Sequence, residues 1–266
     1  MPWCARLGPG GVGLERLSRI RSTDENETVK AFLLAAGQGT RLRPLTERLP
    51  KCLVPIRGVP ILAIWLEICR RNDVDEVLVN LHAQSRMVRD FLAKNQNDVR
   101  VRLFDEPALL GSAGTLRANR AWVESEASFW VFYADVLTAA NLTKMADFHA
   151  QHQGTATLAV CRVPDPSRSG IAVVDEGGVV RQFIEKPENP SGNLAFAGIL
   201  LARPELLDSI PQNGPADLAR DVLPRLVDRM FAYLITDYHL DIGTQESYLA
   251  AQTGWPGLVS SSDVEP

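Results

Sequence analysis

A loop of small residues carries the first chemical signal in this sequence. The apolar run from Val29 leads into Leu34-Ala35-Ala36-Gly37-Gln38-Gly39-Thr40, which predicts a buried strand followed by a glycine loop. Such loops leave backbone N–H groups uncovered at the carboxyl ends of parallel strands, where phosphates bind. In a chain of net charge −4, five cations stand within 17 residues: Arg41, Arg43, Arg48, Lys51 and Arg57. We therefore expect this segment to hold a polyanion the size of a triphosphate.

Two better-known phosphate motifs do not fit this segment. The P-loop needs a Lys that is absent at the required spacing, and the dinucleotide fingerprint needs a third glycine where Leu42 stands. Pro44 also prevents a long helix from starting directly after the loop. These departures argue against a Rossmann oxidoreductase. On glycines and charges alone, the alternative is a strand-to-loop turn beside a solvated basic stretch.

The motif as a whole reads Leu34-Ala35-Ala36-Gly37-Gln38-Gly39-Thr40-Arg41-Leu42-Arg43-Pro44-Leu45-Thr46, then Pro50-Lys51-Cys52-Leu53-Val54-Pro55, with Gly58 and Pro60. It resembles the signature of the sugar-phosphate nucleotidyltransferases, and most of all that of the guanylyltransferases acting on mannose 1-phosphate. The resemblance implies that an NTP, with GTP favoured, reacts with mannose 1-phosphate or a related hexose or heptose 1-phosphate. The products would be an NDP-sugar and pyrophosphate. It also implies nucleotide contacts from Leu34, Ala35, Ala36, Gly37, Gly39 and Thr40.

The implied reaction needs positive charge, a divalent metal and a fixed angle of attack, and it needs no protein nucleophile. By the resemblance, Arg41 holds the β- and γ-phosphates and Lys51 contacts the α-phosphate or the incoming phosphate. Asp135 follows the apolar run 129–134, and Asp241 follows another strand-like stretch. Both match aspartates that bind Mg²⁺ in the family, and Asp135 joins Arg41 and Lys51 as a catalytic residue. Two carboxylates, substrate phosphates and water make an ordinary Mg²⁺ site.

The base-binding loop of the family is matched by residues 106–115. The resemblance assigns nucleotide contacts to Glu106, Gly111, Ser112, Gly114 and Thr115. A carboxylate at position 106 can accept hydrogen bonds from guanine N1–H and from the exocyclic amine together, whereas uracil and thymine offer a single N3–H. We therefore expect Glu106 to favour guanine.

The sugar 1-phosphate would be held by a third set of residues, again by resemblance. These are Gly170, Glu185, Lys186, Ala197 and Gly198, where Glu185 accepts from sugar hydroxyls and Lys186 contacts the phosphate. Phe196 stands where the family commonly has Asn. Because that Asn would supply a polar contact, the sugar pocket is expected to differ from the usual one for mannose.

Three alternatives remain beside this hypothesis. A uridylyl- or thymidylyltransferase would share the fold, and a catalytically silent nucleotide-sugar sensor would keep the pocket. A cytidylyltransferase of the isoprenoid type shares a similar glycine loop, but the segment 41–46 and the element Glu185-Lys186-Pro187 argue against it.

The surrounding pattern predicts an α/β fold that positions these residues. Strands at 29–35, 76–81, 99–104 and 129–133 alternate with helices at 61–71, 85–94 and 113–126, which indicates βαβ units and a parallel sheet. After residue 155 come strands at 155–161, 171–174, 179–184 and 194–201, with a hairpin signal at 176–178, then two helices near 216–228, a strand at 231–235 and a helix from Gln245. We predict a Rossmann-like three-layer sandwich with a mostly parallel mixed sheet and an antiparallel sugar-binding insertion. Residues 1–28 are expected to form a flexible extension, 29–254 the catalytic domain and 255–266 a tail.

Composition and charge argue against two classes of binding partner, nucleic acids and membranes. The net charge of −4 argues against a broad nucleic-acid-binding face, and no apolar run is long enough to span a membrane. Four widely spaced cysteines and the lack of a signal segment favour a cytoplasmic protein, and a homo-oligomer is left open. His149 and His152 are spaced as neighbours on a predicted helix, where a solvated face is expected rather than a metal pair.

Overall fold

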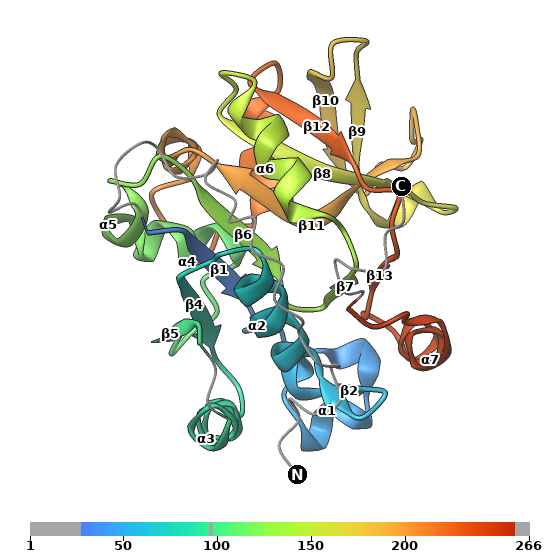
Figure 1. The fold of residues 1–266 in the computed structure, drawn as a ribbon. Coiled ribbons are helices and arrows are strands. Elements are labelled where there is room, and N and C mark those ends of the chain that lie inside the picture. Colours follow the sequence, from blue (N-terminus) through green and yellow to red (C-terminus); the bar gives the residue numbers. More distant parts are fainter. Residues whose placement is uncertain (1–27, 96–97, 259–266) are drawn as a thin grey trace.

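A nine-stranded mixed sheet forms the centre of the computed structural model, which describes residues 28–95 and 98–258 (Figure 1). Its strands follow the order β10-β9-β11-β6-β1-β4-β5, and β8 pairs with both β11 and β12. Helices cover both faces, so the predicted Rossmann-like three-layer fold is confirmed. Within the described ranges, no helix is long and apolar enough to cross a membrane.

The parallel half of the sheet carries the first predicted loop. It consists of β1 (Lys30–Leu34), β4 (Glu76–Leu81), β5 (Arg100–Asp105) and β6 (Phe129–Tyr133). β1 lies between β4 and β6 and runs parallel to both. Because parallel strands are covered on both faces, the central segments are almost wholly apolar. Their carboxyl ends, where residues 35, 82, 106 and 134 follow, meet at one edge of the sheet.

The antiparallel half is joined to β6 through β11 (Leu194–Ala202). Next to β11 lie β8 (Ala156–Arg162) and β9 (Gly170–Val174), and β9 forms the predicted hairpin with β10 (Val180–Glu185). β12 (Met230–Leu234) runs parallel to β8. The register of β11 against β8 shifts between Phe196 and Leu200, which marks a bulge at residues 197–199.

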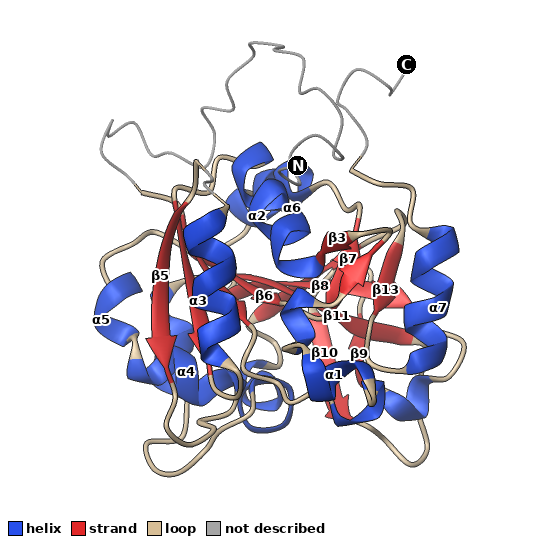
Figure 2. Ribbon diagram, turned by 90° about the horizontal axis from the view of Figure 1, so that it is seen from below, coloured by secondary structure: helices blue, strands red, loops and turns tan. Residues whose placement is uncertain are grey.

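Helices lie on both faces of the sheet (Figures 1 and 2), and an apolar core packs against each face. One face is covered by α2 (Ile61–Arg71), α3 (Ser85–Lys94), α6 (Leu142–Ala150) and α7 (Gln245–Gly254). The other face is covered by α4 (Ser112–Ala118), α5 (Arg120–Val123) and the segment 204–226. Trp255 is 4% exposed and packs in the first core, although the sequence assigns it to the tail. The other residues of the predicted extension and tail lie mostly outside the described ranges.

Of several short elements near the sheet edge, the sequence indicated only one, the strand-like stretch that leads to Asp241. The short elements are α1 (Leu45–Arg48), the antiparallel pair β2 (Pro55–Ile56) and β3 (Val59–Pro60), and the pair β7 (Val136–Thr138) and β13 (His239–Asp241). Runs of two to four residues carry too little periodicity to be recognised in a sequence. The β7–β13 pair matters most, because it brings the region of Asp241 beside the end of β6.

Three predicted helices differ from the structure. The helix expected at 113–126 is broken at Asn119, whose side-chain amide donates to the Thr115 carbonyl at 3.0 Å and ends α4. The two helices expected near 216–228 are a π-helical turn, Leu218–Val222, and a 3-10 turn, Leu223–Leu226. Pro224 has no N–H for a regular helix, which accounts for the second departure.

The expectation that His149 and His152 lie on a solvated helix face is wrong. α6 ends at Ala150, and the two histidines are only 5% and 9% exposed. Both rings lie 2.8 Å from the Thr157 hydroxyl, and the His152 ring stacks on Phe231. Burial, together with the nearby Arg203, lowers the pKa of His149 to about 3 and that of His152 to about 4. Both histidines are therefore neutral in the folded protein at pH 5.

Because the pKa values of the buried His149 and His152 are lowered, we expect the protein to lose stability in mild acid. The unfolded chain protonates its histidines below about pH 6.5, whereas the folded chain resists protonation until about pH 4, so the free energy of unfolding falls across that window. We expect each histidine to contribute a loss of about 2 kcal/mol between pH 7 and pH 5. The double variant His149→Gln/His152→Gln should lose less over the same interval, as measured by urea unfolding. Equal losses in the two proteins would contradict this assignment.

Candidate active site

The loop after β1 folds back over Lys51. Gly39 adopts a left-handed conformation (φ +62°), and a Cβ there would lie 2.8 Å from the Thr46 methyl and 3.2 Å from Lys51 Cβ. The Thr46 hydroxyl donates to the Gly39 carbonyl at 2.7 Å. A glycine is therefore required both by the turn and by the close approach of these neighbours. Gly37, Gln38 and Thr40 remain at least partly exposed beside it.

The Asn80 side chain accepts hydrogen bonds from two backbone N–H groups of the glycine loop that were expected to be free. Its Oδ1 accepts from the N–H groups of Ala35 at 2.6 Å and Ala36 at 3.2 Å. The expectation of uncovered amides is thus wrong for these two residues. Within residues 28–95 and 98–258, the N–H groups of Gly37 and Gly39 have no hydrogen-bond partner. These remain the candidates for a phosphate.

Glu106 is directed inward rather than toward a ligand. It is 3% exposed, and its Oε1 accepts from Asn80 Nδ2 at 2.8 Å and from the Thr115 hydroxyl. Its Oε2 accepts from the Leu110 N–H at 3.0 Å. Both carboxylate oxygens at position 106 are therefore engaged inside the protein, and the structure gives no support to the expectation that Glu106 selects guanine. Glu106 instead ties the loop after β5 to Asn80 and, through Asn80, to the loop after β1.

The rest of this loop is fastened to residues 216–218. The N–H groups of Ala113 and Gly114 both donate to the Ala216 carbonyl, and the Cβ position of Gly111 (φ +78°) lies 2.4 Å from the same oxygen. The Ser112 hydroxyl donates to Asp217 Oδ2 at 3.0 Å and accepts from the Leu218 N–H at 2.7 Å. The side chains of Ser112 and Thr115 are thus held within the protein, and nucleotide contacts from this loop would come from its backbone.

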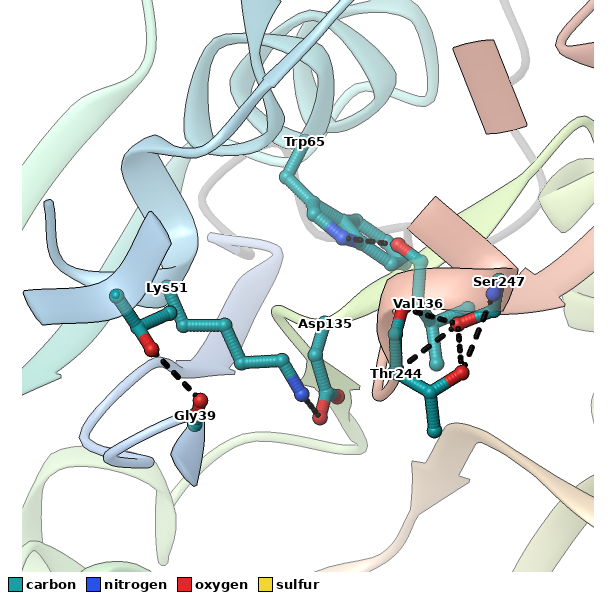
Figure 3. Close-up of polar contacts among 8 residues, drawn as sticks. Gly39, Lys51, Trp65, Asp135, Val136, Thr244 and Ser247 are labelled. Atoms are coloured by element: carbon teal, nitrogen blue, oxygen red, sulfur yellow. Dashed lines mark hydrogen bonds and ion pairs between the residues drawn. The ribbon is translucent and has the colours of Figure 1, made fainter. Parts of the chain in front are cut away.

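Lys51 and Asp135 form the central ion pair of the site (Figure 3). Lys51 Nζ lies 2.6 Å from Asp135 Oδ2, and the two side chains are 10% and 31% exposed. Asp135 follows the end of β6, and the Trp65 indole donates to the adjacent Val136 carbonyl at 2.9 Å. The large buried ring of α2 therefore fixes the backbone that presents this carboxylate.

Asp241 and Arg41 lie beside this pair. The Ile242 N–H donates to the Asp135 carbonyl at 2.7 Å, and Asp241 pairs with Val136 across β13 and β7. A Cβ on Gly243 would lie 2.5 Å from Asp241 Oδ1 and 3.0 Å from Arg41 Nη2, so these two side chains meet over that glycine. Just beyond it, Thr244 and Ser247 cap α7 reciprocally (Figure 3).

The electrostatics of this cluster suit a divalent cation. Partial burial and the nearby Asp135 carboxylate raise the pKa of Asp241, while Lys51, Arg41 and Arg168 oppose that shift. Two carboxylates that disfavour each other's charge are relieved by a cation between them. In the part of the chain that the structure describes, no cluster of three His, Cys, Asp or Glu residues could hold a metal by itself. A metal here would depend on these two aspartates and on ligands from a substrate.

Four of the residues expected to hold a sugar lie on β9, β10 and β11, in the antiparallel half of the sheet, and the fifth, Lys186, directly follows β10. Gly170 pairs with Glu185, and a Cβ at Gly170 would lie 2.6 Å from the Phe183 ring and 2.7 Å from Glu185 Oε2. Burial raises the pKa of Glu185; Lys186, whose Nζ lies 3.5 Å away, opposes that shift. Ala197 and Gly198 (φ +69°) form the bulge of β11.

Tyr133 links the parts of the site and was not predicted. It is the last residue of β6, and burial, followed by the charges of Asp217, Asp135 and Glu185, raises its pKa. Asn80 was missed as well. Both had a signal in the sequence, since each is a residue with a polar tip at or near the end of an otherwise apolar strand.

Arg57, one of the five basic residues expected to hold a polyanion, instead donates to the Trp255 carbonyl.

Known proteins are similar to this chain in sequence. The Nucleotidyl transferase family matches residues 30–255. Mannose-1-phosphate guanylyltransferase 1 of Arabidopsis thaliana is 32% identical over 83% of this chain and 63% of its own length. A putative mannose-1-phosphate guanyltransferase of Sulfolobus acidocaldarius is also 32% identical, over 83% of this chain and 61% of its own. The chain thus spans about three fifths of the length of these curated relatives.

Solved structures share the fold. A putative glucose-1-phosphate thymidylyltransferase from Bacillus anthracis, in complex with a sucrose, superposes with a TM-score of 0.74 at 20% identity, over 85% of this chain and 94% of its own. HddC from Yersinia pseudotuberculosis, complexed with GMP-PN, superposes with a TM-score of 0.71 at 22% identity, over 85% of this chain and 98% of its own.

The Asn80–Glu106 contact predicts a reciprocal rescue. Asn80→Asp places a carboxylate against Glu106, and Glu106→Gln places an NH2 group against a donor, either Asn80 Nδ2 or the Leu110 N–H, so each change should destabilise the protein. In the double variant, the new carboxylate at position 80 still accepts from Ala35 and Ala36, and the new amide at position 106 donates to it. We expect a favourable interaction free energy of about 1–3 kcal/mol from a double-mutant cycle of chemical unfolding. Additive effects would show that the two side chains do not act on each other.

Proposed function

The chain belongs to the nucleotidyl transferase family, and on that basis we propose that it joins a nucleoside triphosphate to a sugar 1-phosphate with release of pyrophosphate. One observation carries the proposal: Arg41, Lys51, Asp135 and Asp241 converge from four separate segments on one edge of the sheet. Two cations and two carboxylates supply what transfer at phosphorus requires, namely charge stabilisation and positioning.

The proposed metal is Mg²⁺, held by Asp135 and Asp241. Mg²⁺ is usually bound by one or two carboxylates together with substrate phosphates and water, and the pair of neighbouring carboxylates fits that demand. When bound, the ion would neutralise charge on the phosphates and orient them for displacement. Lys51 is now paired with Asp135, so sharing that carboxylate with a metal would free its ammonium group for a phosphate oxygen.

The chain's own residues then have separate tasks. Lys51 steadies the α-phosphate or the incoming phosphate, and Arg41 presents a guanidinium fork to the β- and γ-phosphates. An oxygen of the sugar phosphate attacks the α-phosphorus, the bond from that phosphorus to the bridging oxygen of the β-phosphate breaks, and pyrophosphate leaves. The N–H groups of Gly37 and Gly39, with Thr40, would hold the nucleotide, while Leu34, Ala35 and Ala36 form the floor of the loop.

The two substrates are proposed as GTP and mannose 1-phosphate or a related hexose or heptose 1-phosphate. The names of the curated relatives support both choices. Glu106 adds no support for guanine, because its carboxylate is engaged inside the protein. Gly170, Glu185, Lys186, Ala197 and Gly198 are proposed to hold the sugar 1-phosphate, with Lys186 contacting its phosphate and Glu185 its hydroxyls.

A matrix of substrates tests the proposal. Pyrophosphate release should be measured for GTP, UTP, dTTP, CTP and ATP, each with mannose 1-phosphate, glucose 1-phosphate and a heptose 1-phosphate, in the presence of Mg²⁺. We expect turnover with a sugar 1-phosphate, fastest with GTP. Fastest turnover with UTP or dTTP would instead support a uridylyl- or thymidylyltransferase. Nucleotide binding without turnover for every pair would contradict the proposal and favour a non-catalytic sensor.

Variants of the two aspartates test the metal site. Asp135→Asn and Asp241→Asn should each lower kcat/KM at least about 100-fold, because stabilisation of transferring phosphate charge by a metal amounts to several kcal/mol. The matched control is Asp90→Asn, an exposed carboxylate on α3 that should leave kcat/KM unchanged. Circular dichroism should report a folded protein in all three cases. Near-normal turnover in both site variants would place the metal elsewhere.

A further inference from the structure

Tyr133 carries a hydroxyl group that the fold leaves unpaired. The oxygen is buried, and within the described residues it has no hydrogen-bond partner. Buried polar groups are nearly always hydrogen-bonded, and leaving one unpaired costs stability. A hydroxyl kept in this state beside a candidate active site therefore calls for a partner that arrives with a substrate.

The surroundings of this hydroxyl connect the two sides of the site. Asp217, Asp135 and Glu185 all act on it electrostatically, and Ser112 lies beside it. The Ser112 hydroxyl gives its one hydrogen to Asp217, so it has none to donate to the Tyr133 oxygen, and within the described residues it meets that oxygen in no hydrogen bond of ordinary geometry. Tyr133 thus stands between the loop at 106–115 and the residues proposed to hold the sugar.

The ring of Tyr133 packs against the sugar side. Its centroid lies 5.6 Å from that of Phe196, edge to face at 79°, and the Cβ position of Gly198 lies 3.1 Å from Tyr133 Cβ. Gly198 lies in the bulge of β11, and Phe196 is the last paired residue before that bulge. Phe196 offers no hydrogen bond, so at this place the polar contact has to come from another residue.

We propose that the Tyr133 hydroxyl donates a hydrogen bond to a ring hydroxyl of the sugar 1-phosphate and so helps to determine which sugar is accepted. The three surrounding carboxylates disfavour a phosphate group at this point, because like charges repel. A sugar hydroxyl suits the position, since it accepts from the phenol and donates to a carboxylate. This inference rests on the proposed function and names a specificity-determining residue within it.

The first test removes only the oxygen. Tyr133→Phe should lower kcat/KM for the preferred sugar 1-phosphate about three- to tenfold, the range expected for one neutral hydrogen bond, while KM for the nucleotide stays unchanged. Its thermal midpoint should stay level or rise, because an unpaired buried hydroxyl has been removed. A purely structural hydroxyl would instead lower the midpoint and leave kcat/KM for the sugar 1-phosphate unaltered.

Tyr238 provides the matched control. Its hydroxyl is also buried without a partner in the described part of the chain, but its ring packs on Trp255 near the end of α7. Tyr238→Phe makes the same chemical change away from the proposed sugar side. We expect its kcat/KM for the sugar 1-phosphate to equal that of the wild type.

Deoxy substrates identify the contact. With the wild type, one monodeoxy analogue of the preferred sugar 1-phosphate should react about three- to tenfold more slowly than the parent sugar. With Tyr133→Phe, the same analogue and the parent should react alike, because the hydrogen bond has already been lost. A further equal loss with every analogue, or an unchanged kcat/KM in Tyr133→Phe, would overturn the inference. An inactive wild type would overturn the proposed function instead, and this inference with it.

Discussion

The site depends on the placement of two like charges beside one buried cation. Asp135 and Asp241 come from distant parts of the chain and are brought together by the short β7–β13 pair, with Lys51 in contact with Asp135 at 2.6 Å. The backbone around them is fixed by the Trp65 indole on one side and by the cap of α7 on the other. Such rigidity lets the carboxylates stay close although each disfavours the other's charge, and this repulsion favours a metal ion.

A second constraint organises the loops around that cluster. The Asn80 side chain contacts the loop after β1 with its oxygen and the loop after β5 with its nitrogen. Both oxygens of the Glu106 carboxylate are engaged in such internal contacts, so the proposed nucleotide contacts are assigned to backbone N–H groups.

Helices and strands with a regular local pattern could be predicted from the sequence. The helices at 61–71 and 85–94 and the strands at 76–81 and 129–133 have the predicted bounds because their apolar spacing is regular. The convergence of Arg41, Lys51, Asp135 and Asp241 was anticipated from motif resemblance. Contacts such as those of Asn80 and Tyr133, and the burial of His149 and His152, depend on which strands become neighbours, and no local pattern encodes that.

The most direct measurement of the central claim is a crystal structure of the protein with a non-hydrolysable GTP analogue and Mn²⁺ in place of Mg²⁺. The account predicts an anomalous peak within about 2.5 Å of a carboxylate oxygen of both Asp135 and Asp241. Lys51 should then have exchanged Asp135 for a phosphate oxygen. A peak that touches neither aspartate, with the Lys51–Asp135 pair intact beside a bound nucleotide, would contradict it.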